Sequence, residues 1–202
     1  MRGVSSEDIA GSPDFRHLAT IAGIEVDLRY AGANNFVGRD LYSPFDCAWL
    51  HRDAAAALES AVADLAVRAP GHSFLVLDAL RPQRVQQQLW DALDGTGLQI
   101  YLANPARGSI HSYGMALDIT ILDPQGAELD MGTGFDDMTA LSHPALEEQF
   151  LASGQLSAAQ LANRRLLRGA MLDAGFLGID TEWWHFDCGD RELVRRTFRR
   201  VL

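Results

Sequence analysis

Hydrophobic positions follow helical spacing in several parts of the 202-residue chain. The clearest run predicts a helix that ends at Pro70-Gly71, because apolar residues recur every three or four positions until proline and glycine interrupt them. Its apolar positions are Ala54, Ala57, Leu58, Ala61, Val62, Leu65 and Ala66. A second helix should begin at Pro82, and a third at Ser157-x-x-Gln160, a sequence typical of a capping box. A short terminal helix should turn these side chains inward: Leu193, Thr197, Phe198 and Val201.

Shorter segments carry the patterns of β-strands. Residues 73–78 and 115–122 are continuous apolar runs and predict buried strands. Residues 21–30 alternate weakly between apolar and polar and predict a strand, as do residues 182–187. Residues 131–143 are rich in Gly and Asp and predict a loop. Strands and helices therefore alternate along the chain, an order that the pattern alone assigns to either an α/β or an α+β fold.

Composition is that of an ordinary folded domain. Apolar residues make up 48% of the chain and charged residues 22%, so we expect one domain with its own core. The 17 basic residues are outnumbered by 27 acidic ones, which gives a formal net charge of −10. This charge argues against nucleic-acid binding and against docking on anionic lipid, so neither a nucleic-acid nor a membrane partner is expected.

Other global features narrow the class of protein. No apolar run approaches the roughly 20 residues that span a bilayer. Residues 1–8 carry acids and lack an apolar signal core, so we expect a cytoplasmic protein. Cys47 and Cys188 form no C-x-x-C motif, and we expect both thiols to be free and buried. No glycine-rich phosphate loop follows a predicted strand, which argues against a nucleotide-binding fold.

Two segments concentrate side chains that bind metals. One is 109–118 (Ser-Ile-His-Ser-Tyr-Gly-Met-Ala-Leu-Asp) and the other is 182–185 (Glu-Trp-Trp-His). Together they supply two imidazoles and two carboxylates, the ligand chemistry of a catalytic zinc with an open position for water. In a straight strand His111 would lie opposite Asp118, so bringing them together needs a bend, which Gly114 offers.

Alternation along 182–187 would put Trp183 and His185 on one face and Glu182 on the other. Each residue, taken singly, has a commoner structural explanation. A lone His is more often structural than a ligand, an Asp at a strand end is often a cap, and adjacent Trp residues usually pack in a core. It is the combination of H-x6-D with E-W-W-H that favours a metal site.

Five separated motifs resemble a known peptidase family. The S-x-H-x-x-G-x-A-x-D segment and the E-x-W-H segment are similar to the two signatures of the LAS-type zinc peptidases. That group includes D-alanyl-D-alanine carboxypeptidases, D-alanyl-D-alanine dipeptidases and related cell-wall endopeptidases. Three further stretches resemble the VanX-type D-alanyl-D-alanine dipeptidases in particular: 27–30 with 34–38, 78–82 and 131–136. The stretch between Arg81 and Ser109 is shorter than in resistance-associated members, and the tail after His185 differs.

The resemblance implies a role for each site residue. His111, Asp118 and His185 would hold one Zn²⁺ per chain, and Glu182 would act as general base toward the zinc-bound water. Arg81 would face the oxyanion of the tetrahedral intermediate. Without the resemblance, an Arg at a helix end is the simpler interpretation of Arg81.

A free dipeptide carries an ammonium at one end and a carboxylate at the other, and a dipeptidase must pair both. By resemblance, Asp136 is the candidate partner of the ammonium. Ser109 and Tyr30 are candidate hydrogen-bond donors to the substrate. Structural alternatives stay open for two of them, because Asp136 could lie in a solvated turn and Tyr30 could be a core residue.

The implied fold is α+β, a single domain whose central antiparallel sheet is flanked by helices, as in Hedgehog and D,D-peptidase domains. Residues 1–20 would be an N-terminal extension and residues 21–202 the zinc D,D-dipeptidase domain. The implied reaction is hydrolysis of D-alanyl-D-alanine to two D-alanines, and the oligomeric state is left open. One alternative is a murein D,D-carboxypeptidase or endopeptidase. Another is a metal-binding module that has lost hydrolysis, against which the presence of both Glu182 and Arg81 argues.

Overall fold

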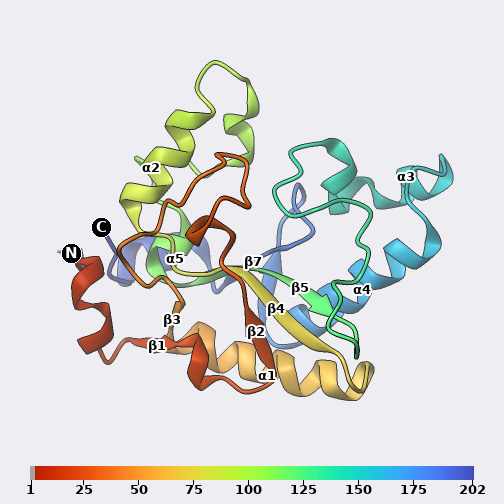
Figure 1. Cartoon of the computed structure of the whole chain (residues 1–202), viewed down its shortest axis with the longest axis horizontal. Helices are drawn as coiled ribbons and strands as arrows, with labels where there is room; N and C mark the ends of the chain where they lie inside the picture. The colour runs from red at the N-terminus through yellow and green to blue at the C-terminus, as the bar shows by residue number, and fades with distance from the viewer. Residues whose placement is uncertain (1–2) are drawn as a thin grey trace.

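The structure, a computed structural model that describes residues 3–202, is built around a five-stranded sheet in the order β2-β4-β5-β7-β6. The bounds of these strands, in that order, are Ile24–Val26, Ser73–Asp78, Ala116–Leu122, His185–Cys188 and Phe176–Gly178. Neighbours from β4 to β6 pair antiparallel, whereas the edge strand β2 pairs parallel with β4. The predicted α+β domain with a central antiparallel sheet is confirmed, with β2 as a parallel edge (Figure 1).

Two long helices cover one face of this sheet, which we call the helix-covered face. They are α1 (Arg52–Arg68), drawn below β2 and β4 in Figure 1, and α4 (Ala158–Asp173), and they pack against each other. The remaining helices are α2 (Gln83–Ala92), α3 (Glu147–Ala152) and α5 (Arg191–Thr197). Alternation along the strands gives each strand one apolar face for these helices.

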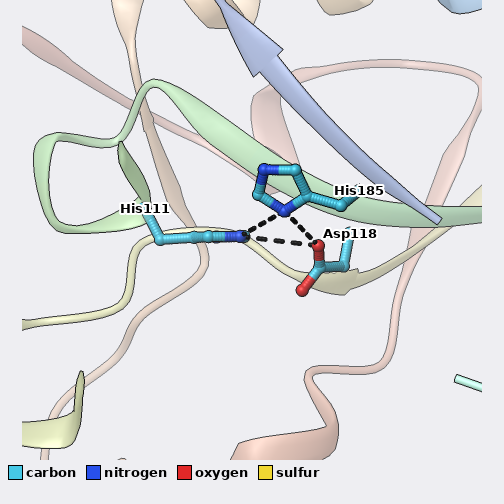
Figure 2. Close-up of side chains that lie close together, drawn as sticks. All are labelled: His111, Asp118 and His185. Atoms are coloured by element: carbon cyan, nitrogen blue, oxygen red, sulfur yellow. Dashed lines mark hydrogen bonds and ion pairs between the residues drawn. The ribbon is translucent and has the colours of Figure 1, made fainter. Parts of the chain in front are cut away.

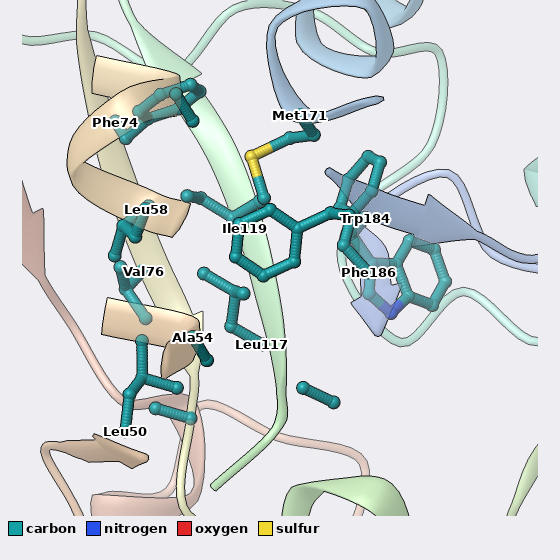
Figure 3. Packing of buried hydrophobic residues seen from close by; sticks show 14 of the residues in the cluster. Leu50, Ala54, Leu58, Phe74, Val76, Leu117, Ile119, Met171, Trp184 and Phe186 are labelled. Carbon is teal, nitrogen blue, oxygen red and sulfur yellow. The ribbon is translucent and has the colours of Figure 1, made fainter. Parts of the chain in front are cut away.

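The main core lies between the helix-covered face and the two long helices. Leu58 of α1 and Met171 of α4 are buried together with the inward side chains of β4 and β5 (Figure 3). Along β4 the inward residues are Phe74 and Val76, while Leu75 points to the opposite face. Because apolar burial contributes about 25 cal/mol per Å², this layer is the main source of stability.

Local patterns predicted the helices better than the strands. Ser157 and Gln160 form the predicted capping box at the start of α4. The strand expected at 21–30 is only three residues long, because the chain turns into a 3-10 helix at Arg29–Ala31 that buries Tyr30. In the terminal helix, the prediction that Leu193 and Thr197 face inward is wrong.

The buried residue of α5 is Val194, whereas Leu193 is 47% exposed. The C-terminal strand begins at His185 rather than at residue 182. Ahead of it, Trp183 and Trp184 are both buried with their rings at 89°, and Trp183 donates to Thr133. The strand alternation predicted for this segment therefore does not apply to the tryptophans.

The N-terminal residues pack against the rest of the chain. Strand β1 (Phe15–His17) pairs antiparallel with β3 (Trp49–His51), and Val4 forms a bridge with Val201. The boundary between an extension at 1–20 and a catalytic domain at 21–202 stays a prediction. Cys47 is buried and Cys188 half-buried, and both are free thiols. Between residues 3 and 202, no helix combines the length and the apolar character needed to cross a membrane.

Candidate metal centre and active site

Three acidic or imidazole side chains lie in one row across the central strands. Asp78 of β4 pairs in register with Asp118 of β5, and Asp118 pairs with His185 of β7. The register of β4 shifts between Val76 and Asp78. This β-bulge turns Asp78 away from the helix-covered face and toward Asp118. The row therefore lies on the opposite face, which we call the site face.

His111 reaches the same place from a turn ahead of β5. Residues Ile110–Tyr113 form a 3-10 helix that ends at Gly114, whose φ of 66° lies in the left-handed region. A Cβ at Gly114 would lie 2.7 Å from the backbone nitrogen of His51, so glycine is required there for two independent reasons. The bend predicted at Gly114 is confirmed, and it folds His111 back over Asp118.

The three predicted ligands converge on one point (Figure 2). The distance from His111 Nε2 to His185 Nδ1 is 3.2 Å, and the distance from His185 Nδ1 to Asp118 Oδ1 is 3.0 Å. One ligand atom from each residue lies within 4.8 Å of the others. His111 and Asp118 are buried and His185 is half-buried. Two imidazoles and one carboxylate in this arrangement could hold a metal ion as its three protein ligands.

The outer hydrogen bonds of both imidazoles fit a metal. His111 Nδ1 donates to the backbone carbonyl of Ala79 at 2.8 Å, and His185 Nε2 donates to Asp187 Oδ1 at 3.0 Å. Burial would lower the pKa of His185, but Asp187 and Asp118 raise it well above its usual range. A proton and a metal ion would therefore compete for this place. Once both imidazoles are neutral and carry their protons on the outer nitrogens, the lone pairs of His111 Nε2 and His185 Nδ1 face Asp118 Oδ1, and a cation would stabilise the three acceptors.

Glu182 lines the same cavity from the segment just ahead of β7. Burial raises the pKa of Glu182 to about 7, with His185 opposing this shift and Asp118 adding to it. By contrast, burial would raise the pKa of Asp118, but the neighbouring His111 and His185 hold it well below its usual range. Two carboxylates in one site thus differ in proton affinity, a pattern typical of acid–base chemistry.

Arg81 is the buried cation of the site. It lies in the short connection between β4 and α2. Its guanidinium donates to Asp78 at 2.8 Å, to Gln86 at 3.1 Å and to Asp118 Oδ2 at 3.3 Å. Bonds on several sides hold the group in one orientation, so it is preorganised toward the cavity that it lines.

Asp136 and Tyr30 form a second polar pair in the cavity. The hydroxyl of the buried Tyr30 donates to Asp136 Oδ2 at 2.8 Å. Asp136 has a φ of 59°, a conformation that costs energy in a residue other than glycine. Burial raises the pKa of Asp136 well above its usual range, although the Tyr30 hydrogen bond lowers it. This carboxylate therefore lies where a cation would stabilise it.

A cavity of about 340 Å³ brings all the predicted site residues together. They are Tyr30, Arg81, Ser109, His111, Asp118, Asp136, Glu182 and His185. The chain matches the peptidase M15 family model described as D-ala-D-ala dipeptidase over residues 13–201. The chain belongs to this family.

Named members of the family are similar over most of this chain. The D-alanyl-D-alanine dipeptidase of Escherichia coli K12 is 38% identical over 81% of this chain and 78% of its own length. The D-alanyl-D-alanine dipeptidase of Enterococcus faecium is 31% identical over 88% of this chain and 92% of its own. A solved structure of an LD-carboxypeptidase covers 92% of this chain and 73% of its own at 14% identity, with a TM-score of 0.46.

Three further side chains at this peptidase site were missed by sequence reasoning. Asp187 accepts from His185, Arg191 pairs with Asp187, and the Tyr101 hydroxyl lies 3.0 Å from His143 Nε2. Asp187 could have been identified from the sequence, because side chains two residues apart on a strand point to the same face, and Asp187 follows His185 by two residues. Nothing in the local pattern marks Tyr101, which reaches the cavity from the end of a 3-10 helix (Leu98–Tyr101) between α2 and β5.

Proposed function

We propose that this peptidase is a zinc-dependent dipeptidase that hydrolyses D-alanyl-D-alanine to two molecules of D-alanine. The observation that carries the proposal is the meeting of three potential ligand atoms with Glu182, Arg81 and Asp136 around one cavity. The names of the relatives support this substrate. A cytoplasmic site of action stays a prediction.

His111, Asp118 and His185 are the residues that would hold the zinc. Two neutral imidazoles and one carboxylate leave such an ion with a net charge near +1. Zinc bound in this way would supply a Lewis acid and would lower the pKa of a bound water molecule to about 7, far below that of bulk water.

Glu182 acts as the general base in this proposal. Its carboxylate takes a proton from the attacking water and then passes that proton to the nitrogen of the departing amine. A base works best when its pKa lies near the working pH, and burial brings the pKa of Glu182 to about 7. This agreement supports Glu182 rather than Asp118, whose carboxylate faces the imidazoles.

Arg81 stabilises negative charge on the carbonyl oxygen of the scissile peptide bond. Its hydrogen bonds to Asp78 and Gln86 fix the guanidinium before the substrate arrives, so little reorganisation is needed in the transition state. A donor of this kind commonly contributes on the order of 3 kcal/mol. Arg81 also contacts Asp118, which couples its orientation to the ligand set.

The ends of a free dipeptide set the remaining requirements. Asp136 would pair with the ammonium, which supplies the positive charge that this buried carboxylate lacks. Tyr30 holds Asp136 through its hydroxyl and lines the cavity beside it. Ser109, which is buried at the cavity wall, would donate to the substrate.

Metal analysis combined with a substrate panel tests the proposal. We expect one zinc per chain in the purified protein, rapid cleavage of D-Ala-D-Ala, and no cleavage of L-Ala-L-Ala. Release of D-alanine from a murein pentapeptide, with the free dipeptide untouched, would instead identify a carboxypeptidase. Zinc binding without cleavage of either substrate would identify a metal-binding module.

A further inference from the structure

The two imidazoles of the metal site are held by different kinds of acceptor. His111 donates its outer N–H to a backbone carbonyl, that of Ala79. His185 donates its outer N–H to a side chain, the carboxylate of Asp187. Any residue at position 79 would offer the backbone carbonyl that His111 uses. The acceptor of His185 is a charged side chain, so it is lost if Asp187 is replaced. The orientation of His185 therefore depends on the identity of one residue.

Asp187 is placed for this contact by the strand itself. It follows His185 by two residues on β7, so both side chains point to the site face. In register it faces Ala116, whose small side chain leaves room for the carboxylate. The side chain of Asp187 is 2% exposed, and Oδ1 lies 3.0 Å from His185 Nε2.

The second carboxylate oxygen is held by Arg191. Arg191 Nε donates to Asp187 Oδ2 at 2.5 Å, and the arginine side chain is 48% exposed. Gly189, which has a φ of 83°, lies in the short turn between the end of β7 and the start of α5. Arg191 is the first residue of α5, where a positive charge opposes the helix dipole. Helix stability therefore does not account for this arginine, and its contact with Asp187 does.

We propose that Asp187, clamped by Arg191, is a positioning residue that fixes the tautomer and ring orientation of His185. The inference rests on the proposed metal site. With Nε2–H bound to Asp187, His185 presents the Nδ1 lone pair toward His111 and Asp118. The negative charge of Asp187 also makes the imidazole a stronger donor to a cation.

A purely structural role is the competing explanation, because the same ion pair joins β7 to α5. Asp64 and Arg68 of α1 provide a matched control, since they form an ion pair with the same spacing of four residues. Asp64 lies on α1, and its carboxylate pairs with Arg68 rather than with a metal ligand. Asp64→Asn therefore reports what loss of such an ion pair does to the fold alone.

The test measures the affinity of the folded, metal-free protein for Zn²⁺ alone by competition with a chromogenic chelator. Asp187→Ala should weaken zinc binding by about 10- to 100-fold, the range found when an outer partner of a ligating histidine is removed. Asp187→Asn keeps an oxygen that accepts from Nε2 but loses the charge, so the loss should be smaller. Asp64→Asn should bind zinc as tightly as the unsubstituted protein.

The unfolding temperature of each metal-free variant separates the two explanations. If Asp187 only joins β7 to α5, its variants unfold earlier but bind zinc as Asp64→Asn does, and that result overturns the proposal. If Asp187→Ala does not fold, Asp187→Asn decides alone by whether its zinc affinity falls. These affinities do not depend on turnover, so a protein that binds zinc without cleaving D-Ala-D-Ala refutes the proposed reaction and leaves this inference testable.

Discussion

The two faces of the central sheet differ in the kind of side chain that they bury. On the helix-covered face, Val76 and Ile119 pack against Leu58 of α1 in a core of apolar side chains. On the site face, Asp118 and His111 are buried although both are polar. Burial of apolar groups stabilises the fold, whereas burial of polar groups costs free energy unless each one finds a partner.

The same strands therefore serve two purposes: the side chains on one face stabilise the fold, and the side chains on the other face form the candidate active site. The polar residues of the site face pair with one another and, in the proposed function, bind a cation, so we expect them to contribute less to the stability of the fold. Substitutions on that face should therefore abolish activity while leaving the metal-free fold as stable or more stable. Substitutions on the helix-covered face should do the reverse.

The largest effect is expected for His111→Ala. Removal of one of three ligands should abolish both zinc binding and hydrolysis of D-Ala-D-Ala. Metal content of the purified variant and its rate on the dipeptide measure the two losses. Full zinc occupancy in this variant would refute the ligand role of His111, and a large drop in metal-free unfolding temperature would contradict the division between the faces.

Glu182→Ala should separate binding from catalysis on the site face. Zinc content should stay at one per chain, because Glu182 is not among the three converging ligands. Turnover should fall by about 10²- to 10⁴-fold, as expected for loss of a general base. The exposed Glu25 on β2 offers a matched control, and Glu25→Ala should retain full activity. Wild-type turnover in Glu182→Ala would remove the general-base assignment.

Leu58→Ala tests the helix-covered face. Leu58 is fully buried, so the substitution leaves a cavity and should lower the free energy of unfolding by about 2–5 kcal/mol. Turnover per folded molecule and zinc content should be unchanged below the unfolding transition. Chemical denaturation measures the first quantity and a dipeptide assay the second. A loss of turnover in the folded variant would show that the two faces are coupled.

The smallest effect is expected for Ser157→Ala. The side chain of Ser157 accepts from the backbone nitrogen of Gln160 at 3.1 Å, which caps α4 far from the site. Its loss should lower the free energy of unfolding by about 1 kcal/mol. Chemical denaturation of both variants should show a smaller loss in the free energy of unfolding for Ser157→Ala than for Leu58→Ala. Both variants should retain activity.

Local sequence patterns predicted much of the helix-covered face and less of the site face. The period of α1 and the capping box of α4 are properties of neighbouring residues, so they were visible without the fold. The strand at β2 was predicted too long, because alternation does not show that Tyr30 turns inward. The strand at β7 was predicted too early, because the hydrogen bond from Trp183 to Thr133 joins distant segments.

Residue types and motif spacing indicated the two segments that could bind a metal, and the roles of the individual site residues came from the family resemblance rather than from geometry. His111 and Asp118 could be linked in advance, since Gly114 offered the bend between them. Asp187 was recognisable in principle from its position two residues after His185. Tyr101 was not, because its place in the cavity depends on the path of the whole connection between α2 and β5, which no periodicity predicts.

The sequence by itself determined which donor atoms this protein has, where α1 ends and where α2 and α4 begin, and that glycine stands where the chain must bend. Only the tertiary structure decided that His111 and His185, 74 residues apart, bring their ring nitrogens within 3.2 Å of each other. The physical reason is that this distance depends on strand register and on the bulge in β4. Both are set by pairing between distant segments and by packing of the opposite face, which no local pattern contains.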